Sequence, residues 1–325
     1  MGVSVFAVTF PGNGFLFNQA ERQHISYFNY GEGIAGDAPT VPDRNRSAEL
    51  LEQEALVAAN SDLGPGLTPN GTYPSDLSIG QAYGADPTNP LDGEIFDSSL
   101  PAGAPAGSYS HVDSFRARFA DQLAAGTVPT FNYITMTSDH TRGTQPGFPI
   151  PSAMMADSDL ALGQLVDTIS HSEIWSSSVI FVVEDDSQDG ADHVDAHRIP
   201  VAVISPYAKQ GAIVHRRYDL LSVVRSMELI MGMEALSLND ALASPMYAAF
   251  TSEPLNAAPV DAIPATVDLL ERNTPAAPWA ALSARLPFGK LDAVPQQQLD
   301  AILWKSVYGA DSTPPPPGPG AEAEE

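Results

Sequence analysis

Acidic residues and histidines crowd one short stretch, residues 184–198, which could bind a divalent cation. Two carboxylates about 4 Å apart repel by roughly 4 kcal/mol at an effective dielectric constant near 20, so such crowding needs a compensating proton, arginine or cation. Because imidazole accompanies the carboxylates, Zn²⁺, Mn²⁺ or Fe suits the stretch better than Ca²⁺ or Mg²⁺, which prefer oxygen ligands. The groups concerned are Glu184, Asp185, Asp186, Asp189, Asp192, His193, Asp195 and His197.

Three other interpretations of this stretch compete with a metal site. It could be a solvated acidic loop with surface histidines. Residues 185–190 fit the opening of a calcium-binding EF-hand loop, but the twelfth position is Ala196 and not glutamate. His193 and His197 have the spacing of the H-E-x-x-H zinc-protease helix, but valine stands where that chemistry needs its general base. The sequence thus disfavours the last two and leaves the solvated loop open.

Asp139 and His140 form a second candidate pair. They follow an apolar segment, as the stretch 184–198 does, and ligands of open α/β sheets bind beyond the carboxyl ends of the strands. Such a pair can also be a turn with a hydrogen-bonded histidine. The interpretation as metal ligands is favoured because two strand ends can share one cleft, which would bring this pair close to the stretch 184–198.

The other histidines and two helical aspartates lack this context. We expect surface or packing roles for the four histidines. Asp157 and Asp159 fall near the start of a predicted helix, where carboxylates interact favourably with the helix dipole, so we expect them to be structural. The four histidines are His24, His111, His171 and His215.

Alternating strands and helices must position these residues. The strand at 178–183 is apolar on both faces, as in a buried parallel sheet. The alternation predicts an α/β fold with a mostly parallel sheet and helices on both faces. Apolar patterning predicts strands over 3–10, 25–30, 130–136, 178–183 and 200–205, and helices over 15–23, 47–59, 114–125, 152–170 (with Ser152 as N-cap), 219–231 and 296–307.

Composition sets the domain boundaries. We expect one α/β domain over residues 1–310. A long loop or lid insertion, dense in Gly, Pro, Asp and Asn, should span 31–110. Residues 311–325, Pro-rich and then acidic, are expected to be a disordered tail.

Charge and residue usage exclude several classes of function. The chain has 325 residues, 40 acidic and 15 basic, with a formal net charge of −25. Such a field repels nucleic acid and attracts divalent cations. No apolar run is long enough to span a membrane and no signal peptide is visible, so we expect a soluble protein, with its compartment left open. The absence of cysteine excludes disulfides and a cysteine nucleophile.

The stretch 184–198, followed by 203–208, resembles the bacterial phosphoesterase family, which includes phospholipase C-type and acid-phosphatase-type enzymes. The resemblance covers most of residues 15–310 apart from the long loop. It implies an alkaline-phosphatase-like core and metal-assisted hydrolysis of phosphate esters. Supporting segments are 27–32, 138–144, 156–163, 225–232 and 303–309.

The resemblance also implies roles for individual residues. Asp185 and Asp186 would be metal ligands, and His193 a ligand or a group facing the phosphate. Asp139 and His140 would lie at the same site, with Asp139 among the metal ligands. The spacing of His197 adds it as a further ligand. The metal stays open among Zn, Mn, Fe, Ca and Mg.

Catalysis at such a site needs a leaving-group acid and a phosphate-binding cation. His140 or His193 could protonate the leaving group. Arg198 or Arg142 could neutralise the charge of the phosphate.

The start of the chain departs from the family pattern. Family members begin with a strand that leads to a Glu-Asn metal motif and then to a Ser or Thr nucleophile. Neither is recognisable near residue 1, and Thr9 precedes no nucleophile turn. The sheet is therefore expected to lack its first strands, which an N-terminal partner polypeptide could supply. The alternative is a non-catalytic, metal-binding half of a split phosphoesterase.

Overall fold

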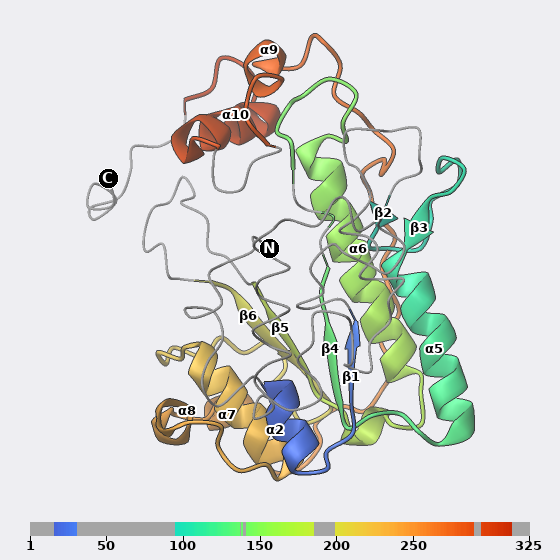
Figure 1. Cartoon of the computed structure of the whole chain (residues 1–325), viewed down its shortest axis with the longest axis vertical. Helices are drawn as coiled ribbons and strands as arrows, with labels where there is room; N and C mark the ends of the chain where they lie inside the picture. Colours follow the sequence, from blue (N-terminus) through green and yellow to red (C-terminus); the bar gives the residue numbers. More distant parts are fainter. Residues whose placement is uncertain are drawn as a thin grey trace, which may run out of the picture. The chain divides into compact units, whose positions relative to one another are not determined.

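The computed structural model describes residues 16–30, 95–136, 138, 141–184, 199–288 and 294–313. Helices and short two-stranded sheets alternate along these residues (Figure 1). The predicted strand at 3–10, the helix at 47–59 and most of the tail lie outside them. Contacts between Cα atoms divide the chain into two compact units: residues 1–87, 113–135 and 207–255 form unit 1, and residues 88–112, 136–206 and 256–325 form unit 2.

A parallel pair of strands organises unit 1. β1 (Tyr27–Tyr30) pairs with β4 (Phe131–Ile134), with Tyr27 opposite Phe131. Helix α2 (Leu16–Arg22) packs Phe17 against both of these rings, at centroid distances of 5.7 and 5.5 Å. Met233 completes this buried aromatic cluster. The first sheet is therefore parallel, as the sequence predicted.

Helices α5 (His111–Ala125) and α7 (Leu220–Met231) begin within three residues of the predicted positions; α7 and all but the first two residues of α5 belong to unit 1. Helix α5 starts three residues before the predicted 114–125 and buries Phe115 and Phe119. In α7, the side chain of the N-cap Asp219 accepts from Ser222 N at 2.9 Å, and Gly232 at φ 72° ends the helix. The remaining short elements are α8 (Leu238–Leu242) and the 3-10 turn η5 (Tyr247–Ala249).

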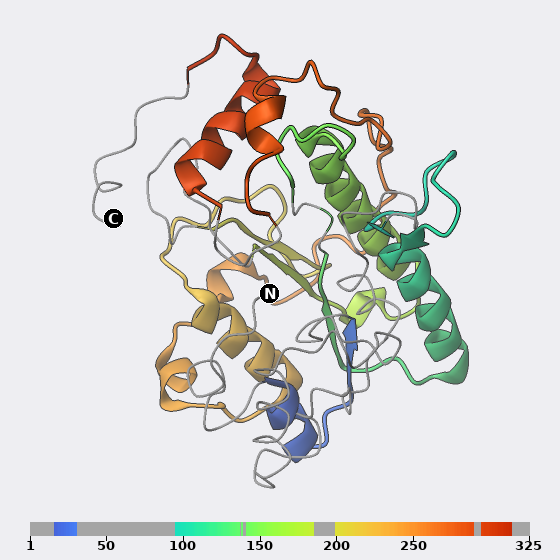
Figure 2. The same ribbon diagram turned by 45° about the horizontal axis from the view of Figure 1, so that its top comes forward.

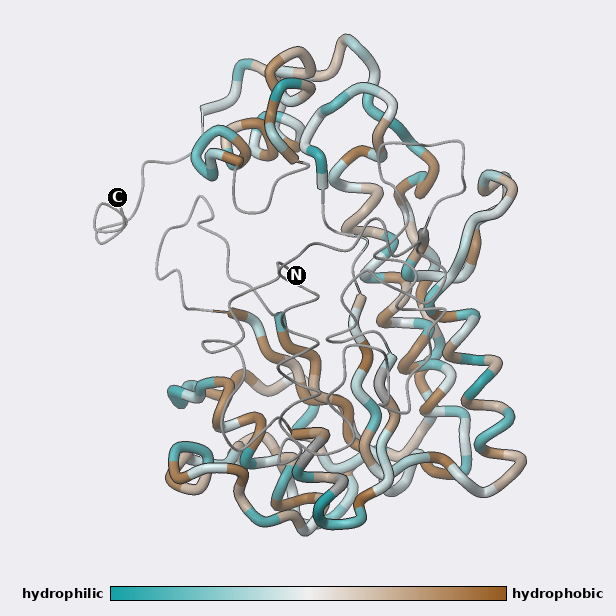
Figure 3. Tube along the Cα trace, viewed as in Figure 1, coloured by the Kyte–Doolittle hydropathy of each residue, from teal (hydrophilic) through white to brown (hydrophobic). Residues whose placement is uncertain are grey.

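The apolar strands of unit 2 pair differently from the prediction. β5 (Ile180–Val183) and β6 (Val201–Ile204) are antiparallel, with Ile180 opposite Ile204. Hydrophobic residues run along both strands (Figure 3), yet each position of β5 keeps partial exposure. An apolar run fits a strand of either direction, so the sequence could not supply the direction of this pair.

Helix α6 (Pro151–Ser170) is the longest described helix of unit 2. Its N-cap is Ile150, so the prediction of Ser152 as N-cap is wrong. The physical reason is Pro151, whose fixed φ suits the first helical position and starts the helix earlier. Ala153, Ala161 and Leu165 form part of its buried face.

Short elements complete unit 2. β2 (Ile95–Phe96) and β3 (Tyr109–Ser110) form a parallel pair that was not predicted. Trp175–Ser177 form the 3-10 turn η4. Figures 1 and 2 show α9 (Ala280–Ser283) beside α10 (Gln296–Tyr308), whose Ile302 is fully buried. Among the described residues, no helix is both long and apolar enough to cross a membrane.

Candidate functional site

All the predicted site residues except Arg142 lie outside the described part of the chain. They all fall within the sequence bounds of unit 2, and several of their immediate neighbours are described. Glu184, the first residue of the acidic stretch, follows β5 and is exposed. The residues outside the described part are Asp139, His140, Asp185, Asp186, His193, His197 and Arg198.

The residue directly before Asp139 is held by a buried carboxylate. Ser138 N donates to Asp97 Oδ2 at 2.8 Å. Asp97 follows β2 and has an exposed fraction of 0%. The chain therefore enters the Asp139–His140 segment from a fixed point.

The residues that follow this segment are held by Ser283 of α9. Ser283 Oγ donates to Arg142 O at 2.7 Å and accepts from Thr144 N at 3.1 Å. Between them lies Gly143, at φ 57°, where a Cβ would come within 2.8 Å of Ser283 Oγ and 3.0 Å of an Ile302 methyl. Only glycine fits this crowded left-handed position without displacement of its neighbours.

A buried asparagine strengthens the same anchor. Asn273 Nδ2 donates to the carbonyl oxygens of Gly143, at 3.1 Å, and Pro149, at 3.0 Å. The guanidinium of Arg142 stacks over the ring of Phe148, 4.6 Å from its centroid. Arg142, which the sequence proposed as a phosphate-binding cation, is thus partly buried beside a firmly held loop.

His111 and Asp97 form a buried pair that sequence reasoning missed. His111 Nδ1 lies 2.5 Å from Asp97 Oδ1, and His111 is 3% exposed. The parallel register sets Phe96 opposite Ser110, so the next residue of each segment meets the other. His24, His171 and His215 are exposed. A histidine at the start of a helix could have indicated a buried pair. The sequence did not reveal its partner, because residues 98–110 between the two are rich in glycine and proline and give no periodic pattern.

Asp157 is structural, as predicted, but for a different reason. It lies beyond the first turn of α6 and is 3% exposed. Its carboxylate accepts from Asp97 N at 2.7 Å and from Ser98 N at 3.1 Å. Burial raises the pKa of Asp157, against the opposing hydrogen bond from Ser98. Asp157 therefore fixes the backbone at Asp97, while Asp159 is exposed.

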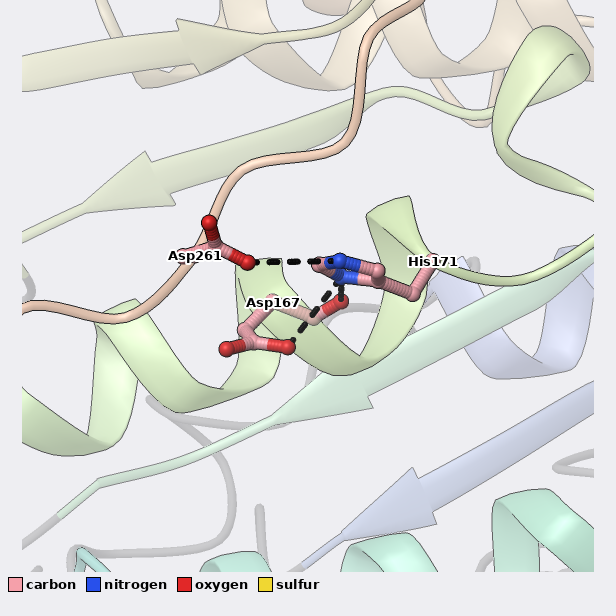
Figure 4. Close-up of side chains that lie close together, drawn as sticks. All are labelled: Asp167, His171 and Asp261. Carbon is pink, nitrogen blue, oxygen red and sulfur yellow. Dashed lines mark hydrogen bonds and ion pairs between the residues drawn. The ribbon is translucent and has the colours of Figure 1, made fainter.

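A second histidine–carboxylate cluster lies at the carboxyl end of α6 (Figure 4). His171 Nδ1 is 3.2 Å from Asp167 Oδ1, and His171 Nε2 is 3.3 Å from Asp261 Oδ1. Ala262 N also donates to Asp167, at 2.9 Å. Ligand atoms of the three side chains lie within 4.8 Å of one another, a spacing that could hold a metal ion. The cluster is largely exposed, since Asp261 is 91% accessible at its side chain.

The comparisons with known proteins concern the part of the chain that contains the predicted site residues. No curated protein matches the chain. A family model matches residues 106–234, which span both predicted site segments. This match supports a phosphoesterase function, and so hydrolysis of phosphate esters. Residues 106–234 thus match the Phosphoesterase family, which confirms over that span the resemblance inferred from the sequence.

Proposed function

We propose that the chain is a metal-dependent phosphoesterase with an alkaline-phosphatase-like core. The observation that carries the proposal is the family match over residues 106–234, because this span contains both Asp139–His140 and the acidic stretch 184–198. The described anchors on either side of Asp139–His140 support it, since a catalytic segment must be held in place.

The donor groups proposed for the metal are carboxylate oxygens and imidazole nitrogens. This set suits Zn²⁺, Mn²⁺ or Fe, and its carboxylates also suit Ca²⁺ or Mg²⁺. A bound divalent ion would supply Lewis-acid stabilisation of the phosphoryl oxygens. The proposed ligands are Asp139, Asp185, Asp186, His193 and His197.

The other roles belong to side chains of the same segments. His140 or His193 would donate a proton to the leaving oxygen. Arg198 or Arg142 would pair with the phosphate charge, and the held backbone of Arg142 favours a fixed position for that cation. The substrate is a phosphate monoester or diester.

The test is hydrolysis of a chromogenic phosphomonoester and a phosphodiester by the whole chain with a panel of divalent metals. Asp185→Ala should abolish metal-dependent turnover and metal retention together. His171→Ala is the matched control, because it removes the exposed cluster at the end of α6 and leaves the proposed site intact. It should keep turnover.

The outcomes distinguish the proposed metal site from the cluster at the end of α6, and a complete enzyme from half of a split one. Unchanged metal content in Asp185→Ala refutes the ligand assignment. Metal loss in His171→Ala would move the metal to the cluster with Asp167 and Asp261. A chain that binds metal and hydrolyses neither ester would support the non-catalytic half of a split phosphoesterase. Turnover gained only when an N-terminal partner polypeptide is added would support the split enzyme.

A further inference from the structure

Basic side chains gather in one loop of an otherwise acidic chain. Residues 209–217, here called the basic loop, lie in unit 1 and precede helix α7. The loop contains three of the 15 basic residues of the chain, Lys209, Arg216 and Arg217, together with His215 and no carboxylate. Because the formal net charge of the whole chain is −25, the basic loop is a local departure from that charge.

The basic loop is held at both ends and open at its turn. Lys209 N donates to Ala249 O at 2.9 Å, and Lys209 Nζ donates to Ala248 O at 2.8 Å. At the other end, Asp219 caps α7. Gly211, at φ 61°, turns the chain, and nothing lies within 4 Å of a Cβ at this position. The turn therefore lies in open space on a fixed base.

The cations of the loop are available to an anionic partner. Arg216 and Arg217 are exposed, and neither forms an ion pair within the part of the chain that the structure describes. The nearest carboxylate in sequence, that of Asp219, accepts from Ser222 N at 2.9 Å and so serves the helix cap. Exposed cations without a carboxylate partner complement a surface of negative charge.

Apolar side chains accompany these cations. Ile213 lies between Lys209 and Arg216 in the loop and is 81% exposed. Tyr247, which is 70% exposed, belongs to η5, the turn whose carbonyl groups accept from Lys209. Leu220, directly after the cap of α7, is also exposed. A single exposed apolar residue needs no explanation, but apolar side chains among Lys and Arg are typical of surfaces that lie in the membrane interface.

An anionic bilayer fits this surface better than a second copy of the chain. In a two-fold dimer centred on the loop, the same surface faces itself. The basic loop would then meet the cations of its copy, which is unfavourable. A bilayer instead offers lipid phosphates to the arginines and an acyl boundary to Ile213. The negative charge of the rest of the chain acts weakly at this contact, because salt screens it beyond about 8 Å at physiological ionic strength.

We propose that the basic loop and Tyr247 bind the surface of an anionic phospholipid bilayer. Arg216 and Arg217 pair with lipid phosphates, and Ile213 inserts at the boundary between headgroups and acyl chains. Each Lys or Arg near such a surface strengthens binding by about 5-fold, and burial of one aliphatic side chain adds about 10-fold or more. This binding does not depend on the proposed function, because every residue that carries it lies in unit 1 and none is a proposed metal ligand.

The experiment is flotation of the whole chain with vesicles of equal parts phosphatidylcholine and phosphatidylglycerol, at physiological ionic strength and with EDTA present. The chelator prevents divalent cations from bridging the acidic surface of the chain to lipid. Vesicles of phosphatidylcholine alone are the control for charge. The chain should float with the anionic vesicles and much less with the neutral ones.

Charge variants locate the cationic part of the surface. The double variant Arg216→Ala with Arg217→Ala should weaken partition into anionic vesicles by about 25-fold. The matched control is Arg22→Ala with Arg116→Ala, which removes the same charge elsewhere in unit 1 and should bind as the parent chain does.

Apolar variants locate the inserted side chain. Ile213→Ser should weaken partition by about 10-fold. Ile263→Ser is its matched control, because Ile263 is 83% exposed but belongs to unit 2, and it should bind as the parent chain does. In Ile213→Trp, indole emission should shift to shorter wavelength when anionic vesicles are added, relative to the parent chain with its three native tryptophans.

Several outcomes would overturn the proposal. Binding of the parent chain to neither vesicle, or equally to both, would do so, and so would equal losses in the loop variants and their controls. An unshifted emission of Ile213→Trp on vesicles that bind it would exclude insertion of the loop. A parent chain that does not float but sediments as a dimer, which Ile213→Ser dissociates, would assign the surface to a second copy instead.

Discussion

The imidazole of His111 and the carboxylate of Asp97 form a buried pair, 2.5 Å apart, at the start of helix α5. The side chains of His111 and Asp97 are 4% and 0% exposed. Because both groups are buried, His111 Nδ1 relies on Asp97 for its hydrogen bond, whereas Asp97 also accepts from Ser138 N and Ser158 Oγ. Asp97 follows β2 and His111 follows β3, so the two residues meet at the end of this strand pair. Asp97 also accepts a hydrogen bond from Ser138 N, which links the strand pair to that backbone.

The tautomer of His111 should depend on residue 97. In the wild-type chain the ring proton is expected on Nδ1, facing Asp97. In Asp97→Asn, the amide oxygen is expected to face Ser138 N and the amide NH₂ to face the ring, so Nδ1 becomes the acceptor and the proton moves to Nε2. Nitrogen-15 NMR of the imidazole at alkaline pH distinguishes the two forms. An unchanged tautomer in the variant would contradict the assigned geometry.

The stability contribution of Glu228 should fall as the pH rises. Burial raises the pKa of Glu228, and its hydrogen bond with Asp240 raises it further, against the opposing hydrogen bond from Arg225. A raised pKa in the folded state means that the proton favours folding. The contribution is therefore fully present below the unfolded pKa and is lost as the pH rises through the folded pKa.

The measurement compares urea denaturation of the wild type and Glu228→Gln between about pH 4 and about pH 8, a range that starts near the ordinary Glu pKa. The wild type should lose stability relative to the variant across this range. Asp240 contributes in the opposite sense: burial raises its pKa, but hydrogen bonds from Ser237 and Glu228 outweigh burial and lower it. Glu234→Gln, at an exposed position nearby, is the control for the loss of one carboxylate from unit 1. A pH-independent difference for Glu228→Gln would be inconsistent with the raised pKa.

The sequence predicted those helices and strands that are determined by neighbouring residues. Asp219 and Gly232 mark the two ends of α7 through capping and a left-handed terminus, and the prediction at 219–231 matches that helix closely. The aromatic strands β1 and β4 likewise follow their apolar patterns. Such signals need only a few neighbouring residues, which a single sequence provides.

Features that depend on distant residues were not predictable in the same way. Asp97 meets Ser138 and Ser158 across 41 and 61 positions of sequence. Its pairing with His111 needs two strands of two residues each, too short to give a periodic pattern. The candidate ligands themselves came from residue types and from the family resemblance, and their ligation remains a prediction.

Gly143→Ala should destabilise the chain more than Gly147→Ala. Both glycines have positive φ, 57° and 88°, so alanine is strained at each. At Gly143 the new Cβ also crowds Ser283 Oγ, whereas nothing lies within 4 Å of a Cβ at Gly147. We expect losses of about 2–4 kcal/mol at Gly143 and about 1–2 kcal/mol at Gly147. Urea midpoints measure both, and equal losses would rule out the crowding.

Ser283 should couple energetically to Gly143. Ser283→Ala leaves Arg142 O and Thr144 N without their hydroxyl partner, at a cost of about 1–3 kcal/mol for a buried donor left unsatisfied. The same change removes the oxygen that a Cβ at Gly143 would meet at 2.8 Å. The double variant should therefore lose less stability than the sum of the single variants, by about 0.5–2 kcal/mol, as expected for residues in contact. Additive losses in the denaturation cycle would show that the contact with Ile302, 3.0 Å from the same Cβ, limits Gly143 instead.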